Sequence, residues 1–308
     1  MPLAPEYAAM FAQLAEAPGP AISEMTPGEA REMYRAMRPL NPELPVANVA
    51  EQSCPGPQGN TIPLRVYTPS GSGPFGILVY YHGGGWVIGD LDCADAVCRD
   101  ICETAGCVVV SVDYRLAPEH PYPAAVDDCI AATAWCADNA ALLGGNGKLA
   151  VGGESAGGNL AAVVAQHARD KQGPDIDFQL LLYPVVDADF STTSYQDNCE
   201  GYLLERATMH WFWDHYCPDL QQRGEAKATP LNAADLSNLP AALVLTAEFD
   251  PLRDEGSSYA DALNAAGSKA EYCCYEGLVH DFFATAQMFK ASRPGLELAC
   301  ERLKAHLN

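Results

Sequence analysis

Ser155 is the residue of this sequence whose setting most clearly suggests chemistry. It lies at the centre of the segment 153–158, Gly-Glu-Ser-Ala-Gly-Gly, which follows the apolar run 148–151 and precedes the helical pattern 159–169. A Gly-x-Ser-x-Gly sequence at a strand-to-helix turn lifts the serine above a sheet, where neighbouring backbone leaves no room for a β-carbon at the glycines. The helix that follows directs its free N–H groups towards negative charge beside the serine. We therefore interpret Ser155 as a nucleophile rather than an ordinary turn serine.

Two phosphate-binding motifs also use glycine-rich turns between a strand and a helix. A Walker loop requires lysine after its second glycine, where this chain has Asn159. A Rossmann fingerprint counted from Gly152 requires glycine where Glu154 stands. Both motifs lack a required residue, so the segment is not interpreted as a phosphate cradle.

A second glycine-rich segment, His82-Gly83-Gly84-Gly85-Trp86, follows the apolar run Ile77–Tyr81. Consecutive glycines let backbone N–H groups approach the negatively charged oxygen of a tetrahedral intermediate. We predict that Gly83 and Gly84 donate to this oxyanion together with Ala156, the residue after the nucleophile. The alternative is a flexible loop, and His82 is expected to hold the loop in place rather than act as a base.

A serine nucleophile needs a base, and the base needs a carboxylate that fixes its tautomer. His280 follows an apolar run and precedes a helical one, so it should lie at the same sheet edge as Ser155, and Asp250 follows the apolar run 241–246 at that edge. Glu248 and Asp254 are rival carboxylates, but Asp254 is expected to cap the helix that begins at Arg253. The chain order Ser155, Asp250, His280 is that of an α/β-hydrolase triad.

These residues require a sheet to position them, and short β-rich runs do alternate with helical patterns from Ile62 onwards. Such alternation predicts an α/β fold with a mostly parallel sheet and helices on both faces. The predicted strands are Ile62–Tyr67, Ile77–Tyr81, Val108–Val112, Leu149–Val151, Leu180–Tyr183, Leu243–Thr246 and Glu271–Tyr275. The predicted helices among them are Asp92–Thr104, Ala124–Asp138, Ala156–Arg169, Arg253–Ala266, Phe282–Phe289 and Leu296–His306.

Two further parts of the chain are expected to form a helical cap over the sheet. Residues 1–45 carry helical patterns at Glu6–Ala17 and Pro27–Met37, the second opened by Thr26 as N-cap. An insertion at about residues 188–225 of the catalytic domain 46–308 carries the aromatic helix Leu204–Tyr216. Trp86 and, within that helix, Trp211 are candidate substrate contacts, although ordinary packing is the alternative for any single aromatic.

Composition excludes several classes of function. The chain has 308 residues, 48% hydrophobic and 19% charged, as in a folded globular protein. Its net charge of −22 would repel nucleic acid and anionic membranes, so neither is an expected partner. No stretch approaches the ~18 uncharged apolar residues of a membrane span. Met1–Glu6 lacks the features of a secretory leader, so a cytoplasmic location is expected unless a targeting segment has been removed.

The twelve cysteines contain no Cys-x-x-Cys pair. The nearest approach to a metal cluster is Cys93, Cys98, Cys102 and Cys107, whose spacing suits a single helix and its flanks better than a zinc ribbon. We therefore expect reduced, mostly buried thiols, no metal and no cofactor.

The motifs together resemble the hormone-sensitive-lipase group of α/β-hydrolases, also called bacterial family IV esterases. The resemblance runs from about residue 45 to the C-terminus and rests on 82–86, Asp113–Ala125, 153–158, Asp250–Gly256 and His280. It implies hydrolysis of carboxylic esters, a helical cap, a preference for short acyl chains, and a homodimer across an edge strand near Glu271–Tyr275. The same machinery would also suit amide or acetyl-group hydrolysis, whereas a related hormone-receptor branch lacks the base histidine.

This sequence departs from the family pattern at two positions. Glu154 stands where many members have aspartate, which conserves the charge. Asp281 follows the base where glycine is common, and so places an additional carboxylate beside His280. Both Asp250 and Asp281 are expected to favour the imidazolium form of this histidine.

Overall fold

A single eight-stranded sheet forms the centre of the computed structural model, which describes residues 2–16, 19–38, 40 and 44–308. The strand order is β1-β2-β4-β3-β5-β6-β7-β8, and only β2 runs opposite to the others. The strands are β1 (Asn48–Pro55), β2 (Thr61–Thr68), β3 (Phe75–Tyr81), β4 (Val108–Val112), β5 (Gly145–Glu154), β6 (Phe178–Leu182), β7 (Ala241–Phe249) and β8 (Ala270–Val279).

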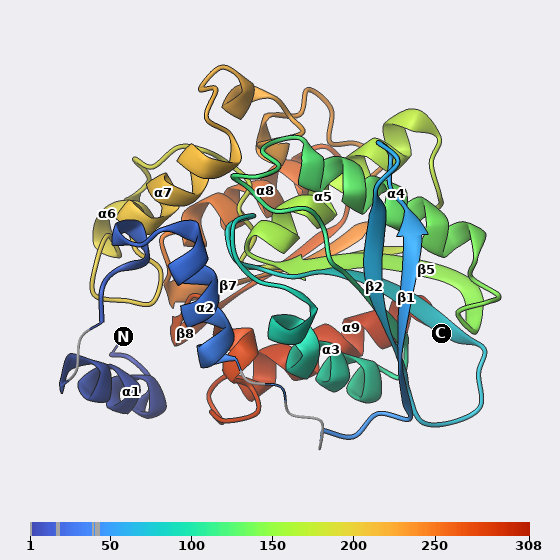
Figure 1. Cartoon of the computed structure of the whole chain (residues 1–308), viewed down its shortest axis with the longest axis horizontal. Coiled ribbons are helices and arrows are strands. Elements are labelled where there is room, and N and C mark those ends of the chain that lie inside the picture. Colours follow the sequence, from blue (N-terminus) through green and yellow to red (C-terminus); the bar gives the residue numbers. More distant parts are fainter. Residues whose placement is uncertain (1, 17–18, 39, 41–43) are drawn as a thin grey trace.

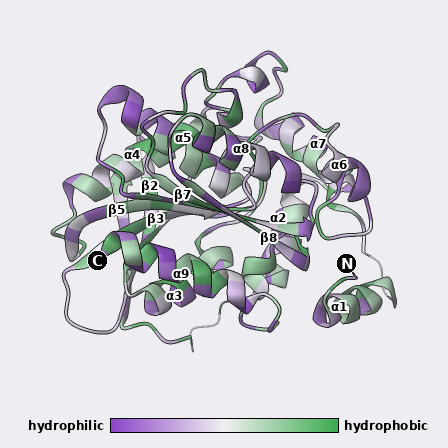
Figure 2. Ribbon diagram, turned by 180° about the vertical axis from the view of Figure 1, so that it is seen from behind, coloured by the Kyte–Doolittle hydropathy of each residue, from purple (hydrophilic) through white to green (hydrophobic). Residues whose placement is uncertain are grey.

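Helices cover both faces of this sheet (Figure 1). One face packs against α3 (Leu91–Ala105) and α9 (Arg293–Leu307), and the other against α4 (Ala124–Asp138), α5 (Ala156–Lys171) and α8 (Arg253–Ala265). The inner strands are apolar on both sides because both sides are covered, as the fully buried β4 shows. Figure 2 shows the same arrangement from behind, with hydrophobic residues concentrated along the strands. The predicted α/β fold with a mostly parallel sheet is confirmed.

Every predicted strand overlaps an observed strand, and most predicted helices overlap an observed helix. The prediction of a helix at Phe282–Phe289 is wrong, because the chain forms only a short 3-10 turn, Phe282–Thr285. The Thr285 hydroxyl donates to the carbonyl of Phe282 at 2.7 Å, and a side chain that bonds backbone in this way competes with a continuing helix.

The N-terminal segment forms α1 (Pro5–Glu16), a short 3-10 turn (Ile22–Glu24) and α2 (Pro27–Met37). The last residue of the predicted helix 6–17 lies outside the described residues. Thr26 caps α2 as predicted: its hydroxyl accepts from the Glu29 N–H, and the Glu29 carboxylate accepts from the Thr26 N–H at 2.8 Å. Tyr7 ties α1 to the body, since its buried hydroxyl lies 2.8 Å from the Ser292 hydroxyl.

The insertion between β6 and β7 contains α6 (Thr193–Asp197) and α7 (Arg206–Tyr216). The 3-10 turn Ile22–Glu24 of the N-terminal segment packs against α7, and α2 and α6 lie at the same end of the molecule in Figures 1 and 2. The two parts of the predicted cap are therefore neighbours. The boundary predicted near residue 45 falls beside residues 41–43, which are outside the described residues.

The described ranges were compared with the expectations about membrane spans, cysteines and metal ligands. No helix in them is long and apolar enough to cross a bilayer. All twelve cysteines lie within them as free thiols, and most are buried. No group of three or more potential metal ligands gathers anywhere in these ranges, the four cysteines at and near α3 included.

Candidate active site

Ser155 occupies the turn between β5 and α5 in a backbone conformation that few residues adopt, with φ 56° and ψ −117°. The end of β6 holds this turn in place, because the Ser155 N–H donates to the carbonyl of Leu182 at 2.8 Å. A β-carbon on Gly157 would lie 1.9 Å from the carbonyl oxygen of Tyr81, and one on Gly153 would lie 2.3 Å from the same atom. The glycines thus allow β3 to approach the turn closely, as the sequence pattern predicts.

The predicted nucleophile, base and carboxylate meet at the carboxyl edge of the sheet. His280 follows β8 directly, and its Nε2 lies 3.1 Å from the Ser155 hydroxyl oxygen. Its Nδ1 lies 2.7 Å from Oδ2 of Asp250, which follows β7 directly. An N–H at Nδ1 that donates to the carboxylate leaves Nε2 as the acceptor for the serine proton. The geometry is that of a nucleophile, a base and an orienting acid.

The two rival carboxylates have other partners. Glu248 accepts from the Gly277 N–H at 2.7 Å, and Asp254 accepts from the Ser194 N–H at 2.7 Å. The expectation that Asp254 caps its own helix is wrong: α8 has no side-chain cap, and Asp254 instead ties the start of α6 to α8. Of the three candidates, the structure brings Asp250 to the histidine.

The electrostatic surroundings of His280 favour its protonated form. Burial lowers the pKa of this imidazole, but the negative charges of Asp250, Asp281 and Glu154 raise it, and the net shift is upwards. Ser155 is 8% exposed and His280 is 7% exposed. The serine and the imidazole are therefore both largely shielded from solvent.

The predicted oxyanion loop connects β3 to α3, and its bend depends on two glycines in the left-handed region, Gly84 at φ 110° and Gly85 at φ 56°. The His82 ring stacks on Tyr114 with centroids 4.3 Å apart, and its Nδ1 lies 2.7 Å from the carbonyl of Gly83. His82 therefore holds the loop, as expected.

The three predicted oxyanion donors lie on the two segments that frame Ser155. Gly83 and Gly84 are on the oxyanion loop, and Ala156 is the first residue of α5. The Gly83 N–H faces the Glu154 carboxylate across a long contact of 3.3 Å. A bound oxyanion would have to replace this contact, and the assignment of the three donors stays a prediction.

The two predicted substrate contacts have different surroundings. Trp86, the last residue of the oxyanion loop, is fully buried and stacked on Tyr216 with ring centroids 4.1 Å apart. Trp211 is partly exposed on α7, with its ring edge against Phe212 and His215. A substrate contact by either tryptophan remains a prediction.

Sequence reasoning missed three residues beside the candidate triad. Tyr183 lies edge-on to the His280 ring with centroids 4.7 Å apart, and its hydroxyl donates to Glu154 at 3.2 Å. Phe212 packs against the oxyanion loop, and Arg38 reaches the site from α2. The aromatic crowding of α7 was a signal for Phe212, whereas no local pattern points to Tyr183 or Arg38.

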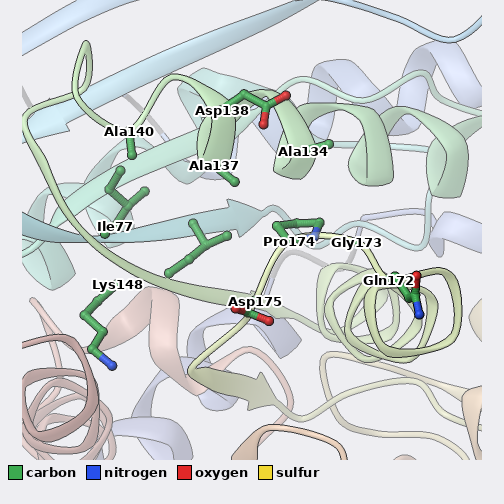
Figure 3. Close-up of a pocket in the computed structure, with 12 residues that line it drawn as sticks. Ile77, Ala134, Ala137, Asp138, Ala140, Lys148, Gln172, Gly173, Pro174 and Asp175 are labelled. Carbon is green, nitrogen blue, oxygen red and sulfur yellow. The ribbon is translucent and has the colours of Figure 1, made fainter.

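A cavity of about 480 Å³ lies towards the amino ends of the parallel strands, away from the carboxyl ends that carry the candidate triad (Figure 3). Ile77 of β3 and residues 147–149, from the first half of β5, line it together with the segment 172–175 that precedes β6. The Ser155 turn is at the opposite end of β5, so this cavity is separate from the candidate active site.

Comparison with known proteins places the chain in a family. A family model described as alpha/beta hydrolase fold matches residues 78–284. The chain is 46% identical to carboxylic ester hydrolase LipN of Mycobacterium tuberculosis, over 85% of this chain and 71% of that protein. It is 36% identical to ethyl acetate hydrolase of Pseudomonas putida, over the full length of both. A solved structure of a thermostable esterase from Pseudomonas putida is similar, with TM-score 0.95 and 38% identity over 100% of this chain and 98% of that one.

Proposed function

The chain belongs to the hormone-sensitive-lipase-like α/β-hydrolases, and on that premise we propose that it is a serine carboxylesterase that hydrolyses short-chain esters through an acyl-enzyme. The observation that carries the proposal is the continuous chain of contacts from the Ser155 hydroxyl through His280 to Asp250. A protein that only binds a ligand would not need a base in contact with the serine.

The first half of the proposed reaction forms the acyl-enzyme. The Ser155 oxygen attacks the carbonyl carbon of the ester while its proton passes to Nε2 of His280, and Asp250 stabilises the resulting imidazolium. The N–H groups of Gly83, Gly84 and Ala156 stabilise the oxyanion. The intermediate then expels the alcohol, which takes the proton from His280.

The second half releases the acid. A water molecule gives its proton to His280 and attacks the acyl carbon, and the same N–H groups hold the second oxyanion. Collapse of this intermediate breaks the bond to Ser155, which recovers its proton from His280. The balance is one ester and one water consumed, with one acid and one alcohol formed.

The preference for short chains rests on the cap. A pocket closed by the N-terminal helices and α7 would gain about 0.8 kcal/mol for each methylene that it can bury, and nothing for a methylene that it cannot hold. The printed name of the Pseudomonas putida relative, ethyl acetate hydrolase, points to a small ester for that protein. We propose the same class of substrate for this chain.

The proposal is tested with a panel of p-nitrophenyl acetate, butyrate, octanoate and laurate. The wild type should show its highest kcat/KM on the shorter esters. Ser155→Ala should lower kcat by about four orders of magnitude or more, because the members of such a unit act together, and should retain the wild-type melting temperature. A Ser155→Ala protein with a tenth of the wild-type activity would rule out the assignment.

We also propose that the chain forms a homodimer across β8, which is an edge strand of the sheet. Tyr272 on this strand is 37% exposed, and an unpaired edge can accept a strand from a second copy. Light scattering should give the mass of two chains, and Tyr272→Lys should shift the population towards one chain.

A further inference from the structure

A row of three arginines, two on helix α2 and one directly after it, contacts the catalytic domain. Arg31 and Arg35 are four residues apart within α2, so they share one face of the helix, and Arg38 is the C-cap residue that follows Met37. Arg31 donates to the carbonyls of Val87 and Ala117 and pairs with Glu119, all near the oxyanion loop or the segment after β4. Arg35 pairs with Asp90. The helix is thereby fastened to the body at successive points.

Arg38, at the C-terminal end of α2, reaches furthest into the site. Its side chain is 10% exposed and pairs with both Asp281, next to the candidate base, and Glu154, next to the candidate nucleophile. The distance from its Nη1 to Oε1 of Glu154 is 3.4 Å. The guanidinium also lies over the Tyr34 ring, 4.2 Å from the centroid, which fixes its approach.

The surroundings of Glu154 and Asp281, the two partners of Arg38, limit how each residue can move. Glu154 is buried, and besides Arg38 it accepts from the Tyr183 hydroxyl at 3.2 Å and from the Gly83 N–H at 3.3 Å. Asp281 has φ 69°, a left-handed conformation that glycine adopts more readily. The Asp281 side chain is paired with Arg38.

The charges that face His280 come from four segments. Asp250 follows β7, Asp281 directly follows His280, and Glu154 ends β5. Arg38, at the end of α2, pairs with Asp281 and Glu154, and the neutral Tyr183 packs against the ring. The pKa of Glu154 is raised overall, because burial outweighs the opposing effect of Arg38. Among these groups, Arg38 is the cation that pairs with Asp281 and Glu154.

We propose that Arg38 is a positioning residue that couples the cap to the catalytic loops, by holding Asp281 and Glu154 in one ion cluster behind His280. The inference rests on the proposed function, because it assigns His280 as the base. When α2 is docked, Arg38 partly offsets the negative charge that Asp281 and Glu154 place near the imidazole. Without Arg38, the Asp281 carboxylate stabilises the imidazolium with no paired cation to offset it, and less of the free base remains at mildly acidic pH.

The test compares three variants of the full chain. Arg38→Met removes the charge, Arg38→Lys retains it, and Arg35→Met is the matched control one turn earlier on the same helix. For Arg38→Met, the ratio of kcat/KM at pH 8 to kcat/KM at pH 6 should rise about threefold or more over the wild-type ratio. Arg38→Lys and Arg35→Met should keep the wild-type ratio. Should Arg38→Met fail to fold, Arg38→Gln removes the same charge.

A purely structural role would lower activity equally at both pH values, so an unchanged ratio in Arg38→Met overturns the proposal. Adding Asp281→Gly to Arg38→Met should bring the ratio back towards wild type, because one unpaired carboxylate is gone. An NMR titration of the His280 ring separates this inference from the proposed function, since it needs no turnover. In the Ser155→Ala background, Arg38→Met should move the His280 midpoint to higher pH, and an unmoved midpoint overturns the proposal.

Discussion

Phe212 and Gly85 are fitted together so closely that no β-carbon could stand between them. A β-carbon on Gly85 would lie 2.1 Å from Cγ of the Phe212 ring. Gly85 belongs to the predicted oxyanion loop and Phe212 to α7 of the insertion, so the insertion directly limits the conformation of the loop. The glycine also has φ 56°, which a larger residue adopts only with strain.

Gly85→Ala should therefore damage catalysis. We expect kcat/KM to fall about a hundredfold, because a shift of about 1 Å in the oxyanion donors has an effect of this size. Gly28→Ala on α2 is the matched control, since a β-carbon there has nothing within 4 Å, and it should leave kcat/KM unchanged. Phe212→Ala should partly rescue Gly85→Ala by opening space, and absence of any rescue would mean that the backbone strain alone decides the outcome.

The wild-type activity should depend on pH with a definite sign. His280 acts in its neutral form, and its pKa is raised by Asp250, Asp281 and Glu154 against the opposing effect of burial. The neutral form is lost as pH falls through the raised pKa, so kcat/KM should decline below an apparent pKa that lies above the ordinary value of about 6.5. A kcat/KM profile measured from pH 5 upwards checks this, and a half-maximum at pH 5 would contradict it.

Asp281→Gly should change both charge and backbone. Removal of the carboxylate lowers the pKa of His280, so the acid limb of the pH profile should move to lower pH. Glycine relieves the left-handed backbone, but the pair with Arg38 is lost, so we expect the free energy of unfolding to change by only about 1 kcal/mol in either direction. A profile identical to that of the wild type would show that this neighbour does not influence the base.

Deletion of residues 1–40 should impair ester binding without removing the candidate triad. The deletion removes the arginine row and the Tyr7 anchor, and exposes the apolar surface beneath α1 and α2. We expect weaker binding of the preferred esters and lower solubility. If the truncated protein stays soluble with unchanged kcat/KM across the chain-length panel, the N-terminal segment is not part of the substrate site.

The elements that position the candidate triad were predictable because they are strongly apolar. The strand predicted at Val108–Val112 matches β4 to the residue, since both of its faces are buried. By contrast β1 was missed: it is an edge strand with Glu51, Gln52 and Pro55, mostly exposed, and shows little alternation. The start of β5 was also missed, because Gly145 and Gly147 resemble a turn.

Contacts between distant segments could not be predicted from local pattern. Arg38 meets residues that are 116 and 243 positions away, and nothing in the N-terminal sequence indicates those partners. Trp86 is a candidate substrate contact, and its stacking on Tyr216 depends on how the insertion folds over the loop, which no local pattern indicates.

The distance along the chain between Ser155 and His280 has a consequence for how the protein acquires activity. The two residues are 125 positions apart, and their contact requires that β5, β6, β7 and β8 have already aligned in parallel. Closing such long loops is entropically unfavourable, and parallel pairing is slow compared with helix formation. After dilution from urea, helical circular dichroism should return first and hydrolytic turnover last, so that turnover reports the moment at which the whole sheet is assembled.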